Sequence, residues 1–351
     1  MRLLELGALE PLRSQTTYHA IAHGVSAGAA PTFSLLWPDR PYVSLGRHRS
    51  LAELDLLECH RRGLAVIRRQ IGGGPVYLDQ RQLFFQITLP VASAPASVEA
   101  SYRVLLAPAV EAFRRLGVAA ALVPPNDICV DRRKLSGTGM ARIGDAIVCV
   151  GNIIFDFDYD AMVRVLALDP PMRRRFGELQ RRYLTTLRRE LRRDVPRTEA
   201  RDALVAAYGE AFGPLVPGVL TPEEERARNE LDVLFASPEW LSGGDLGPTD
   251  EVRQTKVHGA ARVFDIRIER DSAELRATFS IVDGRLEGIE FTCPLLPARA
   301  RRLLARAIQG VAAERDALLR AVGESMRAAT GPFRAEDIVE CIMRSERGRA
   351  T

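Results

Sequence analysis

The sequence contains very little lysine. Among its 49 basic residues only Lys134 and Lys256 are lysines, and all the others are arginines. In such a background a lysine that serves only as an exposed charge is easily replaced by arginine. The two that remain are therefore candidates for sites that need a compact ammonium on a slim stem. Counting alone leaves the chance survival of a solvated residue equally open.

Cysteine is also scarce, and long apolar runs are absent. The five cysteines are scattered singly, which argues against a disulfide framework or a thiolate zinc site. They are Cys59, Cys129, Cys149, Cys293 and Cys341. We expect reduced core thiols in a cytoplasmic protein. No apolar run approaches about 18 residues, so no membrane span is predicted, and the opening segment MRLLELGALEPLRS does not resemble a signal peptide.

Charge of one sign is not in large excess. The net charge of +4 is compatible with an acidic partner or a phosphate-bearing substrate, but it is too small to indicate nucleic acid. The most basic stretch is residues 172–194, MRRRFGELQRRYLTTLRRELRRD. Its arginines could contact phosphates, yet no aromatic platform accompanies them. Two other interpretations stay open: a solvated helix face with acidic partners nearby, or a stripe that attracts an acidic acceptor protein.

The pattern of apolar residues predicts an α+β protein. Helices are predicted at 14–25, 51–63, 97–116, 158–168, 173–193, 197–212, 221–235, 295–309, 311–328 and 335–345. Strands are predicted at 32–38, 41–47, 64–70, 82–90, 120–124, 127–131 and 146–158, with three more inside 261–293. We expect a mixed-sheet domain at 1–245 and a small α+β domain at 246–351, because residues 236–251 are rich in Gly, Pro and acidic side chains.

Three consecutive glycines mark the first candidate site, in VIRRQIGGGPVYLD (residues 66–79). Gly72, Gly73 and Gly74 remove every Cβ along about ten ångströms of backbone, so a ligand can lie against bare amides. Such amides bind anions, and Arg68 and Arg69 suit a carboxylate or a phosphate. A flexible hairpin is the alternative, although the apolar flanks disfavour it. Because GxxxxGK[ST] is absent and no G-x-G-x-x-G opens a helix, the pattern indicates a sheet-based nucleotide site.

The second candidate site is the segment PPNDICVDRRKLSGTGMAR (residues 124–142). Asp127 could hold Mg²⁺, which prefers carboxylate and phosphate oxygens. Lys134 could stabilise charge on a phosphoryl or acyl oxygen, since a single point charge fits between oxygens of two different groups. A polar hairpin with a charged tip is the structural alternative.

Together the two segments resemble the lipoate–protein ligases. That family carries RRxxGGGxV[FY]HD, then ND…K…SG, then HGTLL followed by D.D. This chain has RRQIGGGPVYLD, NDICVDRRKLSGTG and VGNIIFDFD in the same order. Residues 185–191 and 220–240 are also similar. The resemblance covers roughly residues 10–245, and residues 256–330 look more loosely like the family's accessory domain.

The resemblance implies the biotin/lipoate ligase fold with a C-terminal accessory domain. It also implies a two-step reaction, in which ATP with Mg²⁺ converts lipoate or octanoate to acyl-AMP and a lysine of a lipoyl-domain acceptor takes the acyl group. The residues it implies for ATP and acyl-AMP binding are Arg69, Gly72, Gly73, Gly74, Pro75, Val76, Tyr77, Asn126, Asp127, Lys134 and Gly137. Lys134 is the expected catalytic residue and Asp127 the expected Mg²⁺ ligand. We expect a monomer with an acidic acceptor, and neither nucleic acid nor membrane as a partner.

The chain departs from the family pattern at several positions. Leu78 and Val150 replace histidines, and Gln-Arg-Gln at 80–82 replaces a Gly-Asn turn, which leaves the acyl chain and the acceptor open. The nearest rival is an ATP-independent octanoyl or lipoyl transferase, which needs an activated thiol. Cys129 and Cys149 are near Lys134 in sequence, but both lie in apolar strand patterns typical of inert thiols. A biotin ligase is disfavoured because its Gly-Arg-rich signature differs, and the role of Lys256 stays open.

Overall fold

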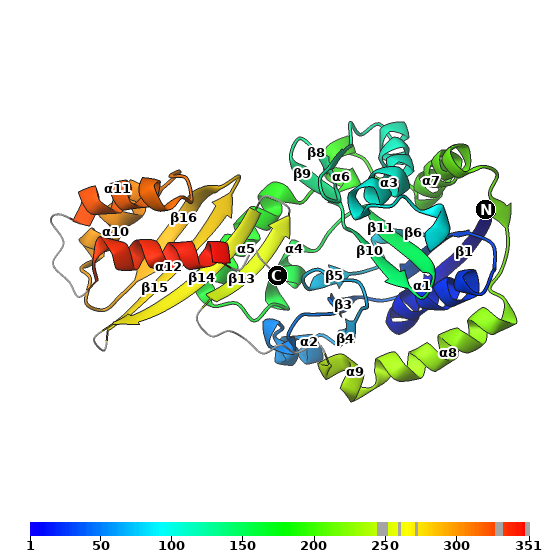
Figure 1. Ribbon diagram of the computed structural model, residues 1–351, viewed down its shortest axis with the longest axis horizontal. Helices are drawn as coiled ribbons and strands as arrows, with labels where there is room; N and C mark the ends of the chain where they lie inside the picture. The colour runs from blue at the N-terminus through cyan, green and yellow to red at the C-terminus, as the bar shows by residue number, and fades with distance from the viewer. Residues whose placement is uncertain (244–251, 259–260, 271–272, 327–332, 348–351) are drawn as a thin grey trace. The chain divides into compact units, whose positions relative to one another are not determined.

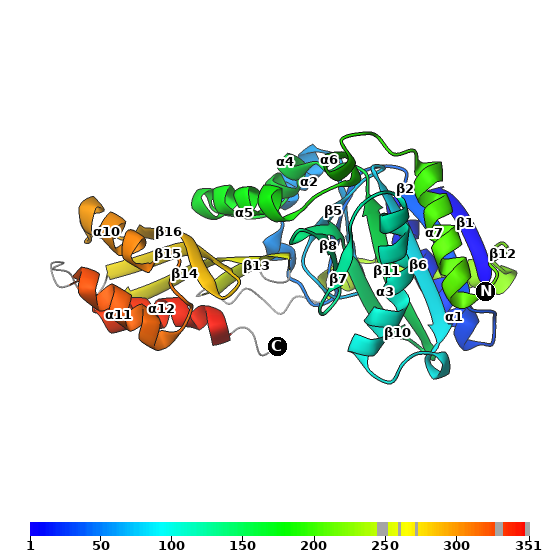
Figure 2. The ribbon, with the colours of Figure 1, turned by 90° about the horizontal axis from the view of Figure 1, so that it is seen from above.

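The computed structural model describes residues 1–243, 252–258, 261–270, 273–326 and 333–347, drawn in Figures 1 and 2. The chain forms two compact units. The first comprises Met1–Ala167 and Leu184–Leu246, and the second comprises Leu168–Tyr183 and Gly247–Thr351. The units differ from the predicted division at 245/246 in one segment, because a helix from the middle of the chain clusters with the C-terminal unit.

The first unit is organised around a six-stranded mixed sheet with the order β10-β11-β6-β2-β1-β12. Its strands are β1 (Arg2–Leu9), β2 (Thr32–Pro38), β6 (Gln82–Pro90), β10 (Thr138–Ile143), β11 (Ala146–Ile154) and β12 (Val216–Pro217). Strand β1 runs parallel to β2 and β12, whereas β2, β6, β11 and β10 are antiparallel neighbours. This mixed sheet confirms the predicted fold class.

Two small sheets accompany the main one. The first has the order β4-β3-β5, from β3 (Tyr42–Leu45), β4 (Ala65–Arg68) and β5 (Val76–Leu78). The second has the order β7-β8-β9, from β7 (Ala121–Val123), β8 (Asp127–Val130) and β9 (Arg133–Ser136). Each of the two candidate sequence motifs therefore starts or ends in one of these small sheets.

Helices cover the main sheet on both faces. The helices of the first unit are α1 (Pro11–Ser26), α2 (Leu56–Arg61), α3 (Val98–Arg115), α4 (Tyr159–Arg164), α6 (Leu187–Leu191), α7 (Arg197–Phe212), α8 (Pro222–Ala236) and α9 (Pro238–Ser242). Two short 3₁₀ turns, η1 (Leu51–Glu53) and η2 (Val91–Ser93), precede α2 and α3. The amphipathic helix α3 begins at Ser97, whose side chain accepts from the amide of Ala100, and Gly117 follows its end with φ +92°, as capping rules predict.

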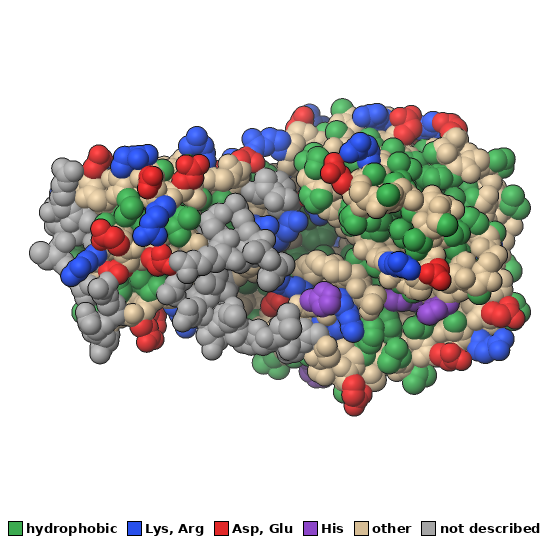
Figure 3. All heavy atoms as spheres, in the orientation of Figure 1, with side chains coloured by type: hydrophobic (Ala, Val, Ile, Leu, Met, Phe, Trp, Pro, Cys, Tyr) green, Lys and Arg blue, Asp and Glu red, His purple; other side chains and the backbone are tan. Residues whose placement is uncertain are grey.

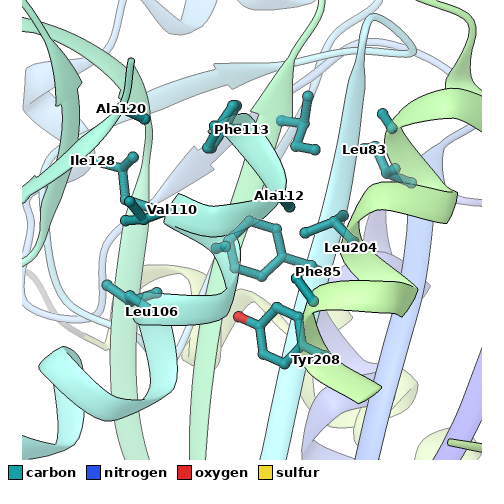
Figure 4. Packing of buried hydrophobic residues seen from close by; sticks show 14 of the residues in the cluster. Leu83, Phe85, Leu106, Val110, Ala112, Phe113, Ala120, Ile128, Leu204 and Tyr208 are labelled. Atoms are coloured by element: carbon teal, nitrogen blue, oxygen red, sulfur yellow. The ribbon is translucent and has the colours of Figure 1, made fainter. Parts of the chain in front are cut away.

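Alternation along β6 and β11 divides the core into two layers. Odd-numbered residues of β6 pack with α3 and α7, and Figure 4 shows Phe85 facing Leu204 and Tyr208 of α7 and Ala112 and Phe113 of α3. The other face lies against α1, where Tyr18 and Ile21 join Val148 in a smaller apolar cluster. This second face carries several buried polar side chains, and it is the face on which the candidate site lies.

The C-terminal unit is a four-stranded antiparallel sheet with helices on both faces. Its strands, in the order β13-β14-β15-β16, are β13 (Val252–His258), β14 (Ala261–Arg270), β15 (Ala273–Val282) and β16 (Arg285–Thr292). Its helices are α5 (Pro170–Tyr183), α10 (Ala298–Ile308), α11 (Arg315–Met326) and α12 (Ala335–Arg347). Figures 1 and 2 show α5 and α12 on opposite sides of the sheet.

Polar contacts join α5 to this sheet. Arg276 of β15 binds both the buried Asp265 of β14 and Asp169, which directly precedes α5. Arg175 donates to the Ser280 hydroxyl at 2.7 Å and to Glu287 at 3.2 Å. On the opposite face, Phe264 and Ile266 alternate with Asp265 and enter the apolar core under α10–α12. The alternation of β14 thus separates an apolar layer from a charged one.

Some predicted elements were wrong in detail. Strands β1, β9, β10 and β13 were missed. Because β13 was missed, the C-terminal sheet was predicted with three strands, whereas it has four. The single helix predicted at 173–193 is broken between α5 and α6, because Leu184 and Thr185 leave the helix to pair with Lys134. Within the expected loop at 236–251, residues 238–242 form α9, and residues 244–251 lie outside the described part. Among the residues that the structure describes, no helix is long and apolar enough to cross a membrane.

The fold predicts an acid sensitivity centred on His19. This side chain of α1 is 4% exposed and its ring packs against Phe235 of α8, and burial lowers the pKa of His19 from 6.5 to about 3. The unfolded state therefore binds the proton first as the pH falls, so stability present above pH 6.5 is lost progressively toward pH 3. Between pH 8 and pH 5 the free energy of unfolding should fall by about 2 kcal/mol more in the native chain than in His19→Phe. Urea denaturation at the two pH values measures this difference, and His60→Gln, at an exposed histidine, should behave like the native chain. An equal fall in His19→Phe would contradict the assignment.

Candidate active site

The three glycines leave an open strip of backbone between β4 and β5. A Cβ built on Gly72 or Gly74 would meet no heavy atom within 4 Å, and Gly73 has φ +102°. The strip is continued by Pro75, which is buried, Val76, which is 37% exposed, and Tyr77, whose ring is buried against Phe157. A ligand can therefore approach the bare amides from outside without displacing a side chain.

Arg69 supports this strip from within. Its guanidinium donates to the carbonyl oxygens of Ser44 (2.8 Å), Gly72 (2.9 Å) and Gly74 (2.8 Å). Burial lowers the pKa of Arg69 to about 10, so the side chain still carries its charge at neutral pH. Because these carbonyls occupy the guanidinium, Arg69 shapes the loop through its backbone.

Arg68 is a second internal support. It is fully buried and donates to four carbonyl oxygens, those of Gly46 (3.1 Å), Arg47 (3.0 Å), Arg49 (2.6 Å) and Leu241 (2.8 Å). The Trp240 indole returns a bond to the Arg68 carbonyl oxygen at 2.9 Å, and Arg47 stacks on the Trp240 ring. Charge-assisted bonds to several carbonyls offset the cost of burying the guanidinium. The segment after α8 is thereby fixed to the base of the loop.

The second motif forms a hairpin from β8 and β9. The Lys134 ammonium lies 2.6 Å from Oδ1 of Asp127, and the two side chains are 20% and 3% exposed. On the other side of β9, the Thr185 amide donates to the Lys134 carbonyl oxygen at 2.9 Å. Asp131 and Arg132 form the hairpin tip with positive φ. The lysine is thus held at its backbone and at its side chain while part of it stays accessible.

Glycine brings the two motifs together. A Cβ built on Gly139 of β10 would lie 2.6 Å from Cγ2 of Ile71, the residue before the glycine strip. Asn126 and Thr138 form two hydrogen bonds with each other. The side-chain amide of Asn126 donates to the Thr138 carbonyl oxygen at 3.0 Å, and the Thr138 hydroxyl donates to the backbone carbonyl oxygen of Asn126. The backbone N–H of Gly137 donates to Oδ1 of Asn152 at 2.7 Å. Asn126 and Gly137 therefore both hold the backbone around Lys134.

The structure offers limited support for a protein-held metal. Asp127 is engaged by Lys134, and the described residues contain no group of three or more His, Cys, Asp or Glu side chains arranged for a metal ion. A magnesium ion at Asp127 would therefore take most of its ligands from phosphate oxygens and water, as is usual for Mg²⁺ beside nucleotides.

Several arginines of the arginine-rich stretch pair with acidic side chains, among them Arg188 and Arg193 in the first unit, which contact Asp156 at 3.0 Å and Glu199 at 2.6 Å. Arg174 contacts Glu290 at 3.1 Å, while Arg175 and Arg182 contact Glu287 at 3.2 and 3.1 Å. Figure 3 shows basic and acidic side chains interspersed on the visible face of the C-terminal unit. Of the three interpretations of this stretch, the helix face with acidic partners agrees best with these contacts.

All five cysteines are buried. Burial, together with the nearby Asp127 carboxylate, raises the pKa of Cys129 to about 11, although Lys134 opposes the shift. Burial raises the pKa of Cys149 to about 12. Neither thiol therefore has the lowered pKa of a thiolate nucleophile.

The segment that contains both motifs matches a known protein family. Residues 10–209 match the family model of the lipoyl protein ligase A/B catalytic domain, which is more than half of the chain. The chain belongs to this family. The matched segment contains the glycine strip, Asp127 and Lys134.

Family relatives include both transferases and ligases. The octanoyltransferase LipM of Kyrpidia tusciae is 27% identical over 271 residues, which cover 68% of this chain and 97% of the relative. The lipoate-protein ligase LplJ of Bacillus subtilis is 29% identical over 135 residues, which cover 38% of this chain and 40% of the relative.

Solved structures share the fold. A bi-partite lipoate protein ligase from Thermoplasma acidophilum matches with a TM-score of 0.64 at 24% identity, over 71% of this chain and 98% of its own. LipL1 of P. falciparum matches with a TM-score of 0.55 at 13% identity, over 98% of this chain and 99% of its own.

Two family histidines are replaced by apolar residues in this chain. Val150 lies on β11, where it packs against the apolar cluster that contains Ile71 and Tyr18. Leu78 ends β5 and pairs with Tyr42 of β3. Both positions therefore extend the apolar environment around the glycine strip.

Sequence reasoning missed several residues that build this site. Gln82 and Asn152 are buried polar side chains in the predicted strands QLFFQITLP and AIVCVGNIIFDFD. Their signal was an amide in an otherwise apolar strand, because a buried polar group must find a partner. Arg68 was read as a possible anion ligand, and its role in fixing residues 46–49 had no signal in the sequence.

Gly46 provides a test of the loop geometry. A Cβ at Gly46 would lie 1.9 Å from the Gly73 carbonyl oxygen, so Gly46→Ala must displace the glycine strip and should cost about 3 kcal/mol in the free energy of unfolding. Gly74→Ala is the matched control, because its Cβ would enter open space; it should change stability by about 0.5 kcal/mol or less. Urea denaturation of both variants measures the difference, and equal losses would show that the close approach is not a constraint.

Proposed function

We propose that this chain is an ATP-dependent lipoate–protein ligase. It joins lipoate or octanoate to AMP and then transfers the acyl group to a lysine of a lipoyl domain. The observation that carries the proposal is a partly exposed ammonium, Lys134, in a scaffold that abuts a side-chain-free strip of amides, while every cysteine is buried.

In the first step a carboxylate oxygen of the acyl substrate attacks the α-phosphorus of ATP, and pyrophosphate leaves. The amides of residues 72–77 provide donors for phosphate oxygens, and Gly72 and Gly74 leave the space that such a ligand needs. Lys134 neutralises charge that grows on the α-phosphoryl oxygens, a contribution of about 3–4 kcal/mol on the scale of one oxyanion donor. Arg69 keeps the carbonyls of the strip turned inward. Mg²⁺, bound chiefly by phosphate with Asp127 nearby, supplies further charge neutralisation when present.

In the second step the neutral amine of the acceptor lysine attacks the acyl carbon, an amide bond forms, and AMP leaves. Lys134 serves again, because an oxyanion develops on the acyl oxygen. Asp127 orients the ammonium between the two steps, since its carboxylate is the charged partner that Lys134 has in the structure.

The relatives differ in how much of this chain they cover. The LipM alignment covers 97% of that octanoyltransferase and only 68% of this chain, whereas LipL1, crystallised in complex with lipoate, shares the fold over 98% of this chain. The Thermoplasma ligase likewise matches over 98% of its own chain and 71% of this chain, so the support for a ligase comes from the site and not from the length. We assign residues 1–245 to catalysis and 246–351 to the accessory role, with α5 supplied by the catalytic segment.

The proposed acceptor is an acidic lipoyl domain. The Thermoplasma ligase belongs to a lipoylation system whose structural analysis includes its E2 lipoyl domain, and the net charge of +4 is compatible with an acidic partner. We propose that the enzyme acts as a cytoplasmic monomer.

A second candidate function is an ATP-independent octanoyl or lipoyl transferase, favoured by the LipM relatives. Such an enzyme forms a thioester on a cysteine. Cys129 is the strongest candidate for that cysteine, because it faces Lys134 across the β8–β9 ladder, although burial opposes its ionisation.

Lys134→Arg tests the central role of the amine. The planar guanidinium cannot occupy the place between two substrates that a point charge fills, so pyrophosphate release from ATP and lipoate should fall by about 10²–10³-fold while the melting temperature changes little. Arg103→Lys, an exposed exchange on α3, is the control for altering a cation. Near-native activity of Lys134→Arg would refute the role.

The double variant Cys129→Ser, Cys149→Ser separates the two candidate functions. An ATP-dependent ligase should keep at least half of its transfer rate, since neither thiol reacts, and transfer should require ATP. A thioester transferase should lose all transfer and should work from octanoyl thioesters without ATP. Mass spectrometry of a lipoyl domain, with and without ATP, distinguishes these outcomes.

A further inference from the structure

Two buried amides connect the motifs of the candidate site. Gln82 of β6 is 1% exposed and Asn152 of β11 is 8% exposed, in strands whose neighbours are mostly apolar. Both lie on the even-numbered face, opposite the apolar layer of α3 and α7. A buried amide that finds no partner is costly, so the bonds that these two side chains make decide how the strands around them are held.

The amides form one continuous chain of hydrogen bonds. The Gly137 N–H donates to Oδ1 of Asn152 at 2.7 Å, and Nδ2 of Asn152 donates to Oε1 of Gln82 at 2.7 Å. Nε2 of Gln82 then donates to the Tyr77 carbonyl oxygen at 3.3 Å. The Ser136 hydroxyl adds a bond on each side of Asn152, donating to Oδ1 at 3.4 Å and accepting from its backbone N–H at 3.3 Å.

The two ends of this chain fix its direction. A backbone N–H, as at Gly137, only donates, and a carbonyl oxygen, as at Tyr77, only accepts. Asn152 must therefore turn its oxygen to Gly137 and its nitrogen to Gln82, which in turn must point its nitrogen to Tyr77. Reversal of either amide would place like groups against each other at two contacts, so the arrangement admits one orientation.

The chain spans the two halves of the site. Tyr77 continues the glycine strip into β5, and Gly137 directly follows β9, which carries Lys134. The three side-chain bonds therefore form one connected link between the two motifs.

We infer that Gln82 and Asn152 are positioning residues that set the placement of the glycine strip relative to Lys134. The inference rests on the proposed function, because adenylation requires amides of the strip and the ammonium to meet the same phosphate. A displacement of about 1 Å between such groups can cost about 100-fold in rate. Loss of the chain should therefore lower the rate of adenylation more than it weakens the binding of ATP.

Gln82→Met breaks the chain with little change of side-chain length. Tyr208→Phe is the matched control, because it removes another buried hydrogen bond, from Tyr208 to the Leu105 carbonyl oxygen at 2.9 Å, on the opposite face of the same sheet. Three measurements are made on both full-length variants: the single-turnover rate of pyrophosphate release with saturating lipoate, the dissociation constant for MgATP, and hydrogen exchange at the Gly137 amide. If Gln82→Met folds poorly, Gln82→Glu, which can still accept from Asn152 but cannot donate to Tyr77 when ionised, replaces it.

The expected result for Gln82→Met is at least a tenfold slower release, a less than threefold change in the dissociation constant, and at least tenfold faster exchange at Gly137. Tyr208→Phe should match the native chain in all three. Unchanged exchange at Gly137 would overturn the inference, as would faster exchange without a slower rate, or equal losses in the control. If the native chain releases no pyrophosphate, the proposed function fails, whereas the exchange measurement and the rate of octanoyl transfer still decide whether the two amides position the site.

Discussion

The site depends on backbone packed directly against backbone. Gly46 and Gly73 approach so closely that no Cβ fits between them, and Gly139 leaves no room for a side chain beside Ile71. These contacts bring three separate segments, the turn after β3, the glycine strip and β10, into one layer. Glycine costs conformational entropy wherever it is used, and here that cost permits the close approach of these three segments.

Internal charges hold this layer in place. Arg68 and Arg69 follow each other in sequence and serve the same purpose, because both guanidinium groups bind carbonyl oxygens of the surrounding loops. A guanidinium suits this work, since its planar fork can bond several acceptors at once. Lys134 has a different environment, with one carboxylate partner and a partly exposed ammonium. The two arginines thus bind several backbone acceptors each, whereas the lysine pairs with one carboxylate and keeps part of its ammonium exposed.

The sequence predicted the fold class correctly, whereas the anion-binding role of the glycine strip stays a prediction. The polar hairpin that was the structural alternative for residues 124–142 is present as β8 and β9. Strands β9 and β10 were missed because their residues, RKLS and TGMARI, lack clean alternation, and their pairing depends on neighbours distant in sequence. Helix α5 was assigned to the first domain because nothing local reveals that Asp169 and Arg175 bind residues about a hundred positions later.

Helix α5 lies on the segment of chain that connects the two units. The helix packs with the C-terminal sheet, yet the residues that follow it, Leu184 and Thr185, pair with Lys134 in β9. The chain itself therefore connects the C-terminal sheet, through α5, to the backbone of β9. Both ends of this connection are held by residues distant in sequence, Arg276 and Glu287 on one side and Lys134 on the other. The helical pattern of residues 173–193 could not reveal this change of partners, because it depends on contacts that no local sequence signal encodes.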